Sequence, residues 1–245
     1  MQPDLLHAAA SVGWAEAQLP SFVERIERWL ADNIEIVIEE TPAPATHDIM
    51  VAVKKEAFPL AFNVEFGAYI NAIRSGLDIL ATSLAERYSA CKPEDAYFPI
   101  ARNKAAFLAG GYRAKEFVKG LPPTPRAIIE SLEPYTGGNS LLVELNQLDI
   151  MRKHRRLIDI NIVPQSLFID HRGSKIFEGE VVFPDRREDK TILGRIRKDA
   201  ARSKIKFTPA ITLREPQSAG GKDVIAALRQ FASLAHSIIN LFDTP

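Results

Sequence analysis

Apolar residues that recur at intervals of three and four predict one long amphipathic helix over residues 66–88. One side of this helix carries Phe66, Tyr69, Ile70, Ile73, Leu77, Leu80 and Leu84. The adjoining polar stripe carries Asn71, Arg74, Ser75 and Asp78. Arg74 and Asp78 are one turn apart and can form an ion pair. This combination is typical of a helix packed inside a bundle, and we expect the rest of the chain to bury it.

The same periodicity predicts three further long helices, over about residues 4–31, 141–158 and 222–242. Asn139 or Ser140 is expected to cap the helix that begins near residue 141. Shorter helices are predicted over residues 105–119, with a break at a pair of glycines, and over residues 126–132.

Alternation of Ile or Val with Glu over residues 34–40 predicts a half-buried strand. A returning strand over residues 49–54, after a proline-containing turn, completes a hairpin. Further strands are predicted over residues 160–169, 176–183 and 204–213, and the charged stretch before the last of these is expected to be partly exposed. The chain is therefore expected to be an α+β protein. Its predicted architecture is a helical bundle with a small flanking antiparallel sheet, in a single domain spanning residues 1–245.

Charge is balanced over the whole chain but divided between its parts. The formal net charge is +0, so no global field attracts nucleic acid. Residues 1–50 contain nine acidic residues and two arginines, whereas residues 151–206 contain fifteen lysines and arginines against eight acidic residues. This division is consistent with two parts that attract each other or a partner subunit, and also with an anion-binding face.

Several classes of protein are disfavoured by the composition. Cys91 is the single cysteine, so the chain can form neither an internal disulfide nor a cysteine-based zinc site. The histidines lack the spacing of metal ligands, and we predict no metal and no cofactor. No apolar run has the length of a membrane span, and the first residues do not form a secretion signal. We expect a cytoplasmic protein that does not bind membranes.

The polar residues suggest one candidate catalytic cluster, consisting of Arg74, Asp78 and His154. His154 lies three residues after Met151 and four before Ile158, so it is expected to face the apolar side of its helix. Asp78 would then orient His154, and Arg74 would bind an anion beside it. Such a site suits hydrolysis or transfer at a phosphodiester. The alternative interpretation is a buried polar network that fixes the packing of the helices.

The residues predicted to contact nucleic acid are Asn71, Lys153, Arg155 and Arg156. The last three belong to the run Arg-Lys-His-Arg-Arg, which begins at Arg152 and can bind phosphates. Four positive charges around one helical turn can equally form a solvated face. No aromatic residue interleaves with them, as a platform for stacked bases would require.

Four segments, in this order, resemble a widespread family of uncharacterised bacterial proteins: NAIRSGLDILATSL, YFPI, GLPPTPRAIIESLEPYTGG and LDIMRKHRRLI. The first is also similar to the Arg-x4-His signature of HEPN domains, which are helical bundles of prokaryotic toxins and defence systems, many of them ribonucleases. The resemblance assigns Arg74 to the signature arginine, and Ile79 occupies the histidine position. Either His154 supplies the imidazole from another helix, or the bundle is kept without the reaction.

The resemblance implies a HEPN-like protein of a bacterial stress or defence system that binds RNA or cleaves it without a metal. It also implies a homodimer. The alternative is a non-catalytic structural or interaction protein with a partner protein, in which the cluster of Arg74, Asp78 and His154 is a packing network.

Overall fold

The computed structural model describes residues 1–158, 160–169, 177–178, 190–198, 205–214, 216 and 219–243. The chain divides into two compact units. The helical unit consists of Met1–Pro20, Leu60–Ile160 and Leu213–Pro245, and the strand unit consists of Ser21–Pro59 and Asn161–Thr212. The helix α1 contributes its first part to the helical unit and its second part to the strand unit.

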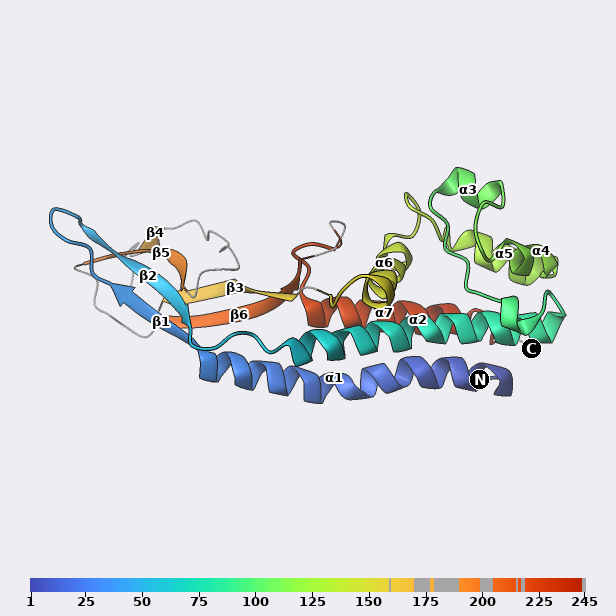
Figure 1. The fold of residues 1–245 in the computed structure, drawn as a ribbon, viewed down its shortest axis with the longest axis horizontal. Helices are drawn as coiled ribbons and strands as arrows, with labels where there is room; N and C mark the ends of the chain where they lie inside the picture. Colours follow the sequence, from blue (N-terminus) through green and yellow to red (C-terminus); the bar gives the residue numbers. More distant parts are fainter. Residues whose placement is uncertain are drawn as a thin grey trace. The chain divides into compact units, whose positions relative to one another are not determined.

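Four long helices dominate the helical unit (Figure 1). Their bounds are α1 Leu6–Asn33, α2 Leu60–Tyr88, α6 Ser140–His154 and α7 Val224–Asn240. The Asn139 side chain accepts a hydrogen bond from the Leu142 N–H at 3.1 Å, which confirms the predicted cap of α6. The Asp223 side chain caps α7 in the same way.

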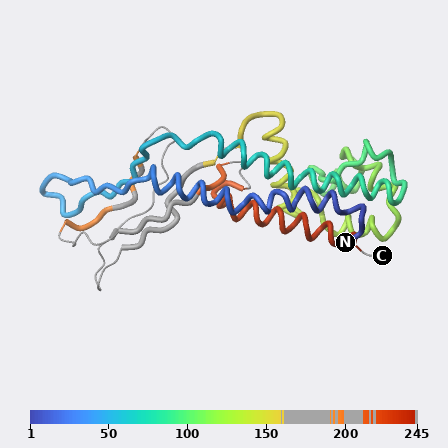
Figure 2. The backbone as a smooth tube through the Cα atoms, turned by 90° about the horizontal axis from the view of Figure 1, so that it is seen from below, coloured from blue at the N-terminus to red at the C-terminus, as the bar shows by residue number. Residues whose placement is uncertain are grey.

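The helix α2 is the centre of the helical unit, because most of its residues are buried. On the side towards α1, Gly76 allows close approach: a Cβ there would lie 2.7 Å from Val12 Cγ2 and 3.0 Å from the Ala8 carbonyl oxygen. The Ser11 hydroxyl donates a hydrogen bond to the Ala72 carbonyl at 2.8 Å. Figure 2 shows α7 beside the first part of α1, where His236 and Glu16 are 2.9 Å apart.

Short elements connect α2 to α6. They are the 3-10 helix η2 Pro93–Asp95 and the helices α3 Lys104–Leu108, α4 Lys115–Gly120 and α5 Pro123–Ser131. A further 3-10 helix, η1 Pro3–Leu5, precedes α1. Within the connection, the Ala101 N–H donates to the Pro134 carbonyl at 2.8 Å, and Ala101 forms an isolated bridge with Tyr135. This contact holds two loop segments together beside α2.

The strand unit contains β1 Ile34–Glu39, β2 His47–Lys54, β3 Ile160–Ile169, β4 Phe177–Glu178, β5 Lys190–Arg197 and β6 Ile205–Leu213. Four of these strands form a sheet in the order β1-β2-β5-β4, and each neighbouring pair is antiparallel. The strands β3 and β6 form a second sheet of two strands. The predicted hairpin of β1 and β2 is therefore confirmed.

The α+β class and the antiparallel sheet are confirmed, with several corrections. The helix α2 begins at Leu60 rather than Phe66, and α6 ends at His154 rather than near residue 158. The strand β5 lies in the charged stretch where no strand was predicted. Most of the strand predicted over residues 176–183 falls outside the described residues. The prediction of a single domain over residues 1–245 stays a prediction. Within the described part of the chain, no helix combines the length and apolar character that crossing a bilayer requires.

Candidate functional site

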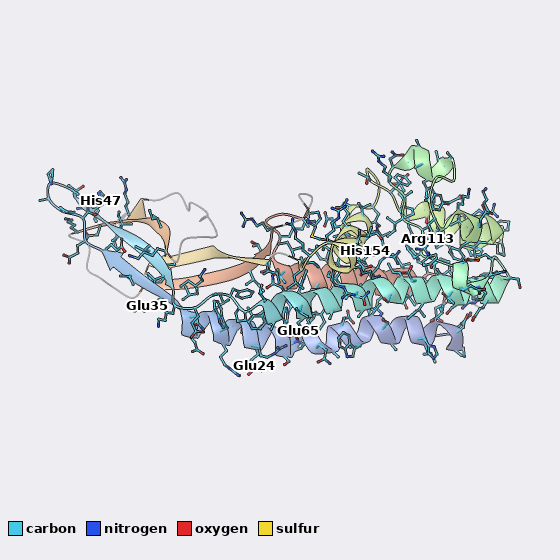
Figure 3. The ribbon with its side chains drawn as sticks, viewed as in Figure 1. Glu24, Glu35, His47, Glu65, Arg113 and His154 are labelled. Carbon is cyan, nitrogen blue, oxygen red and sulfur yellow. The ribbon has the colours of Figure 1, made fainter. Side chains whose placement is uncertain are left out.

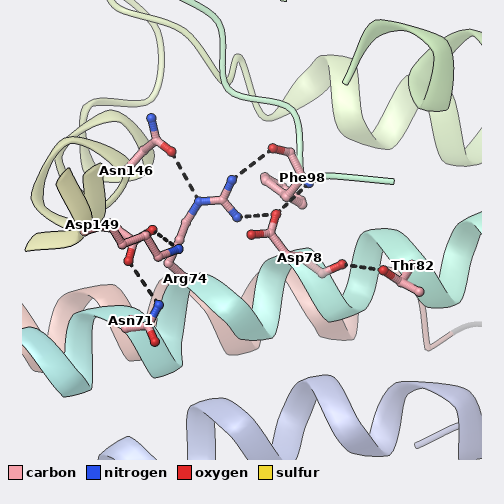
Figure 4. A network of polar contacts seen from close by, with 8 residues as sticks. Asn71, Arg74, Asp78, Thr82, Phe98, Asn146 and Asp149 are labelled. Atoms are coloured by element: carbon pink, nitrogen blue, oxygen red, sulfur yellow. Dashed lines mark hydrogen bonds and ion pairs between the residues drawn. The ribbon is translucent and has the colours of Figure 1, made fainter. Parts of the chain in front are cut away.

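Arg74 lies at the centre of a polar network between α2 and α6 (Figure 4). Its side chain is 8% exposed. The Nη1 atom is 2.6 Å from Asp78 Oδ1, and the Nε–H donates to Asn146 Oδ1 at 3.3 Å. The Nη2–H donates to the Phe98 carbonyl at 3.2 Å. Nε and Nη2 are thus hydrogen bonded within the protein, whereas the buried Nη1 has the ion pair with Asp78 but no hydrogen bond. The buried charge is nevertheless balanced by a carboxylate of the same helix.

Asp78 completes a clamp on the backbone of Phe98. Its Oδ1 atom accepts the Phe98 N–H at 3.0 Å, while Arg74 binds the carbonyl of the same residue. Phe98 is itself buried and belongs to the segment YFPI. Two of the segments that carry the family resemblance are thus joined directly, one on α2 and one in the following loop. The predicted pairing of Arg74 with Asp78 is confirmed, and its observed contacts fix this loop.

A second set of contacts joins α2 to α6 through Asp149. This carboxylate is buried, with a side-chain exposure of 6%. Its Oδ1 atom accepts a hydrogen bond from Asn71 Nδ2 at 3.2 Å, and its Oδ2 atom is 2.7 Å from Lys153 Nζ. Asn71 and Lys153 were predicted to contact nucleic acid. In the structure both contact the same internal carboxylate.

The prediction that His154 faces the interior is wrong, because its side chain is exposed. His154 is the last residue of α6 (Figure 3), and it lies eight residues after Asn146, which contacts Arg74. Eight residues correspond to about 12 Å along a helix. Asp78 is instead bound to Arg74 and to Phe98. The imidazole therefore does not join the Arg74 network.

The basic run at the end of α6 is largely exposed. Its exposed residues are Lys153, His154, Arg155 and Arg156, and Arg152 is half-buried. The aliphatic part of Arg152 packs over Gly67, where a Cβ would lie 2.7 Å from Arg152 Cδ. Cations at a helix C-terminus also stabilise the helix through its dipole. The run thus has a structural effect whether or not it binds an anion.

Sequence reasoning missed Asn146, Asp149 and Glu144 as partners. Glu144 is buried and is 2.6 Å from Lys222 Nζ, a contact that joins α6 to the segment before α7. The missed signal is a polar residue inside an apolar stripe: Asp149 follows the buried Leu148 and precedes Lys153 by four residues. Such a residue needs an internal partner when its helix is packed on both sides.

A cavity of about 430 Å³ lies at another part of the helical unit. Its lining residues are Gln2, Arg87, Tyr88, Pro122, Thr124, Pro125, Ile128, Leu241 and Phe242. None of the predicted site residues lines this cavity. The Arg74 network therefore does not open into it.

Comparison of the chain with protein-family models, with curated proteins and with solved structures finds no match. The geometry of the described residues is therefore the basis for a functional proposal.

Proposed function

We propose that the chain is a non-catalytic interaction protein in which Arg74, Asp78 and Asn71 hold the helical unit together. The observation that supports this proposal best is that an ion pair and two hydrogen bonds hold the buried Arg74 guanidinium against groups of the protein itself. A catalytic arginine has to reach a substrate, whereas this one contacts its own helix, the next long helix and a loop backbone.

The proposal includes a HEPN-like bundle without the nuclease reaction. The signature histidine position is Ile79, which follows Asp78 directly and cannot transfer a proton. The exposed His154, at the end of α6, does not supply the missing imidazole to Arg74. A general acid or base has to lie within hydrogen-bonding distance of the reacting group. Because neither Ile79 nor His154 meets this requirement beside Arg74, the arrangement supports a bundle that interacts with a partner through its surface and does not catalyse a reaction.

A second candidate function is binding of RNA phosphates by the basic run at the end of α6. The observation that favours it is the exposure of His154, Arg155 and Arg156 on consecutive residues. Phosphate binding of this kind needs positive charge at the surface and is strongly weakened by salt. It would require no catalysis, and it would leave Arg74 in its structural role.

The experiment is incubation of a mixed RNA pool with the wild-type protein and with His154→Ala, at low and at high salt, with cleavage and binding measured in parallel. We expect no cleavage by either protein. Cleavage by the wild type that His154→Ala abolishes without a change in melting temperature would overturn the proposal.

Binding separates the two candidates. If the basic run binds RNA, the double variant Arg155→Ala, Arg156→Ala loses binding, and the dependence of affinity on salt becomes less steep. The matched control is Arg102→Ala, which removes an exposed arginine of the loop between η2 and α3. Equal binding by all three proteins, or no binding at all, would exclude the phosphate site at α6.

A further inference from the structure

The strand β1 occupies an edge of the four-stranded sheet. Within the part of the chain that the structure describes, β2 is its one hydrogen-bonded neighbour. The pairing runs without a register shift from Ile34, opposite Lys54, to Glu39, opposite Ile49. An edge strand carries a row of backbone donors and acceptors that can pair with another chain.

The hydrogen-bond pattern identifies which groups of β1 point outwards. The Lys55 N–H donates to the Asn33 carbonyl at 2.9 Å, so these opposed residues form a hydrogen-bonded pair. In an antiparallel ladder such pairs alternate with non-bonded ones. Glu35, Val37 and Glu39 therefore direct their backbone groups to β2. The N–H and C=O groups of Ile34, Ile36 and Ile38 face the open edge.

Side chains along β1 alternate in chemistry as well as in direction. The three isoleucines are half-buried and share one face of the sheet, and Glu35, Val37 and Glu39 share the other. The Glu35 and Glu39 side chains are 57% and 42% exposed. Each already faces a lysine, Lys55 and Lys190 respectively, but exposed pairs of this kind are weak and exchange readily. The strand itself contains no proline, no lysine and no bulge of the kinds that protect edges.

A second copy of β1 is a poor partner for this edge. Two such strands side by side would bring glutamates into neighbouring positions, and like charges on adjacent strands are destabilising. A strand with basic residues beside Glu35 and Glu39, and apolar residues beside the isoleucines, is complementary in both respects.

We propose that an extended segment of a partner protein, with alternating basic and apolar residues, adds as a further strand to the edge of β1 that no described strand occupies. The inference rests on the proposed interaction function and names the surface that carries it. The outward backbone groups of Ile34, Ile36 and Ile38 supply the hydrogen bonds, as in other cases of strand addition. The glutamates select basic side chains in the partner.

The test uses a fluorescently labelled peptide of alternating lysine and valine, and fluorescence anisotropy to measure its affinity for the full chain. We expect binding by the wild type, and no binding of a peptide with the same composition whose lysines and valines are grouped in two blocks. N-methylation of the valines removes donors needed for the ladder. It should weaken binding by about tenfold or more, since backbone groups are then left unpaired.

Two protein variants separate backbone pairing from side-chain attraction. Ile36→Pro removes an N–H that points away from β2, so the sheet can keep its own ladder while the docked strand loses a partner. The matched control Ile36→Thr keeps the N–H and a β-branched side chain, and it should bind the peptide. The variant Glu35→Lys with Glu39→Lys should instead prefer a peptide of alternating glutamate and valine.

Equal binding of the methylated and unmethylated peptides would overturn the inference, because attraction would then need no ladder. A wild-type dimer in sedimentation that Ile36→Pro dissociates would also overturn it, since a second copy would occupy the edge. Either result leaves the RNA cleavage assay unaffected, so failure of this inference is distinguishable from failure of the proposed function.

Discussion

Single residues show how charges are used in the helical unit. Besides Arg74, the clearest case is Arg87 near the end of α2, which binds Asp4 through two hydrogen bonds of 2.8 Å. A third bond of 3.0 Å joins Arg87 to the Phe242 carbonyl after α7. The hydrogen bond from Arg87 lowers the pKa of Asp4 below its ordinary value, and the same contact raises the pKa of Arg87. One side chain thus fastens both ends of the chain to α2.

This pair predicts a pH-dependent contribution to stability. Because the pKa of Asp4 is lowered in the folded state, the stabilisation is complete above the unfolded pKa of about 3.9 and is lost as the pH falls through the folded pKa. The difference in free energy of unfolding between the wild type and Asp4→Asn should therefore shrink on going from about pH 6 to about pH 2. Urea unfolding across this range measures it.

Arg87→Ala serves as the second arm of the same experiment. It removes the group that lowers the pKa of Asp4, so its difference from the wild type should also shrink in acid. A difference that stays constant over the whole range for both variants would contradict the assignment.

At the level of single residues, the sequence predicted pairs within one helix better than pairs between elements. Arg74 and Asp78 are one turn apart, so their contact follows from helix geometry alone. Asn146 and the Phe98 backbone come from segments whose placement depends on tertiary packing. His154 was misplaced because α6 ends at this residue, so Ile158, which was used to define the apolar side, lies outside the helix.

Among the elements, the packing of α1 against α2 depends on a glycine. A Cβ at Gly76 would lie 3.0 Å from the Ala8 carbonyl, a backbone atom that cannot rotate away, and 2.7 Å from Val12 Cγ2. The helix α1 also contains Gly13, where a Cβ would meet nothing within 4 Å. Gly13 therefore serves as the control for Gly76, because both are helical glycines and only Gly76 is crowded.

Substitution by alanine should have opposite effects at these two glycines. Gly76→Ala should lower the free energy of unfolding by about 1–3 kcal/mol, because overpacking outweighs the better helix propensity of alanine. Gly13→Ala should raise it by up to about 1 kcal/mol through that propensity alone. Urea unfolding of both variants measures the effects. Stabilisation by Gly76→Ala would show that α1 and α2 do not approach closely at this point.

The strand β5 was not predicted from the sequence, and this failure has an identifiable physical cause. Where β2 pairs with β5, Met50 is opposite Gly194 and Val51 is opposite Ile192. Leu193 therefore has no opposite residue in β2 and forms a bulge in β5. A bulge breaks the period-two alternation by which strands are recognised. Gly194 inside the charged stretch was the available signal, because glycine within a strand often marks such a site. The uninterrupted alternation of β1 explains why that strand was predicted almost to the residue.

Over the whole molecule, the division of charge in the sequence has a partial explanation in the strand unit. Lys190 of β5 pairs with Glu39 of β1, and Lys198 lies 3.8 Å from the buried Asp48 of β2. Basic residues of the later segment therefore lie beside acidic residues of the first segment inside one unit. This supports the interpretation that the two segments attract each other. The fold class was predictable because the spacing of apolar residues along the chain distinguishes helices from strands. Binding partners were not predictable, because they depend on surfaces assembled from segments that are distant in the sequence.

The central claim is that the Arg74 network holds the helical unit together, and the most direct test is urea unfolding of Arg74→Ala beside His154→Ala. Removing the buried Arg74 leaves Asp78, Asn146 and the Phe98 carbonyl without their partner, so we expect a loss of about 2–3 kcal/mol in the free energy of unfolding. The exposed His154 should change it by no more than about 0.5 kcal/mol. An Arg74→Ala protein as stable as the wild type would contradict the account, because the arginine would then be free for another role.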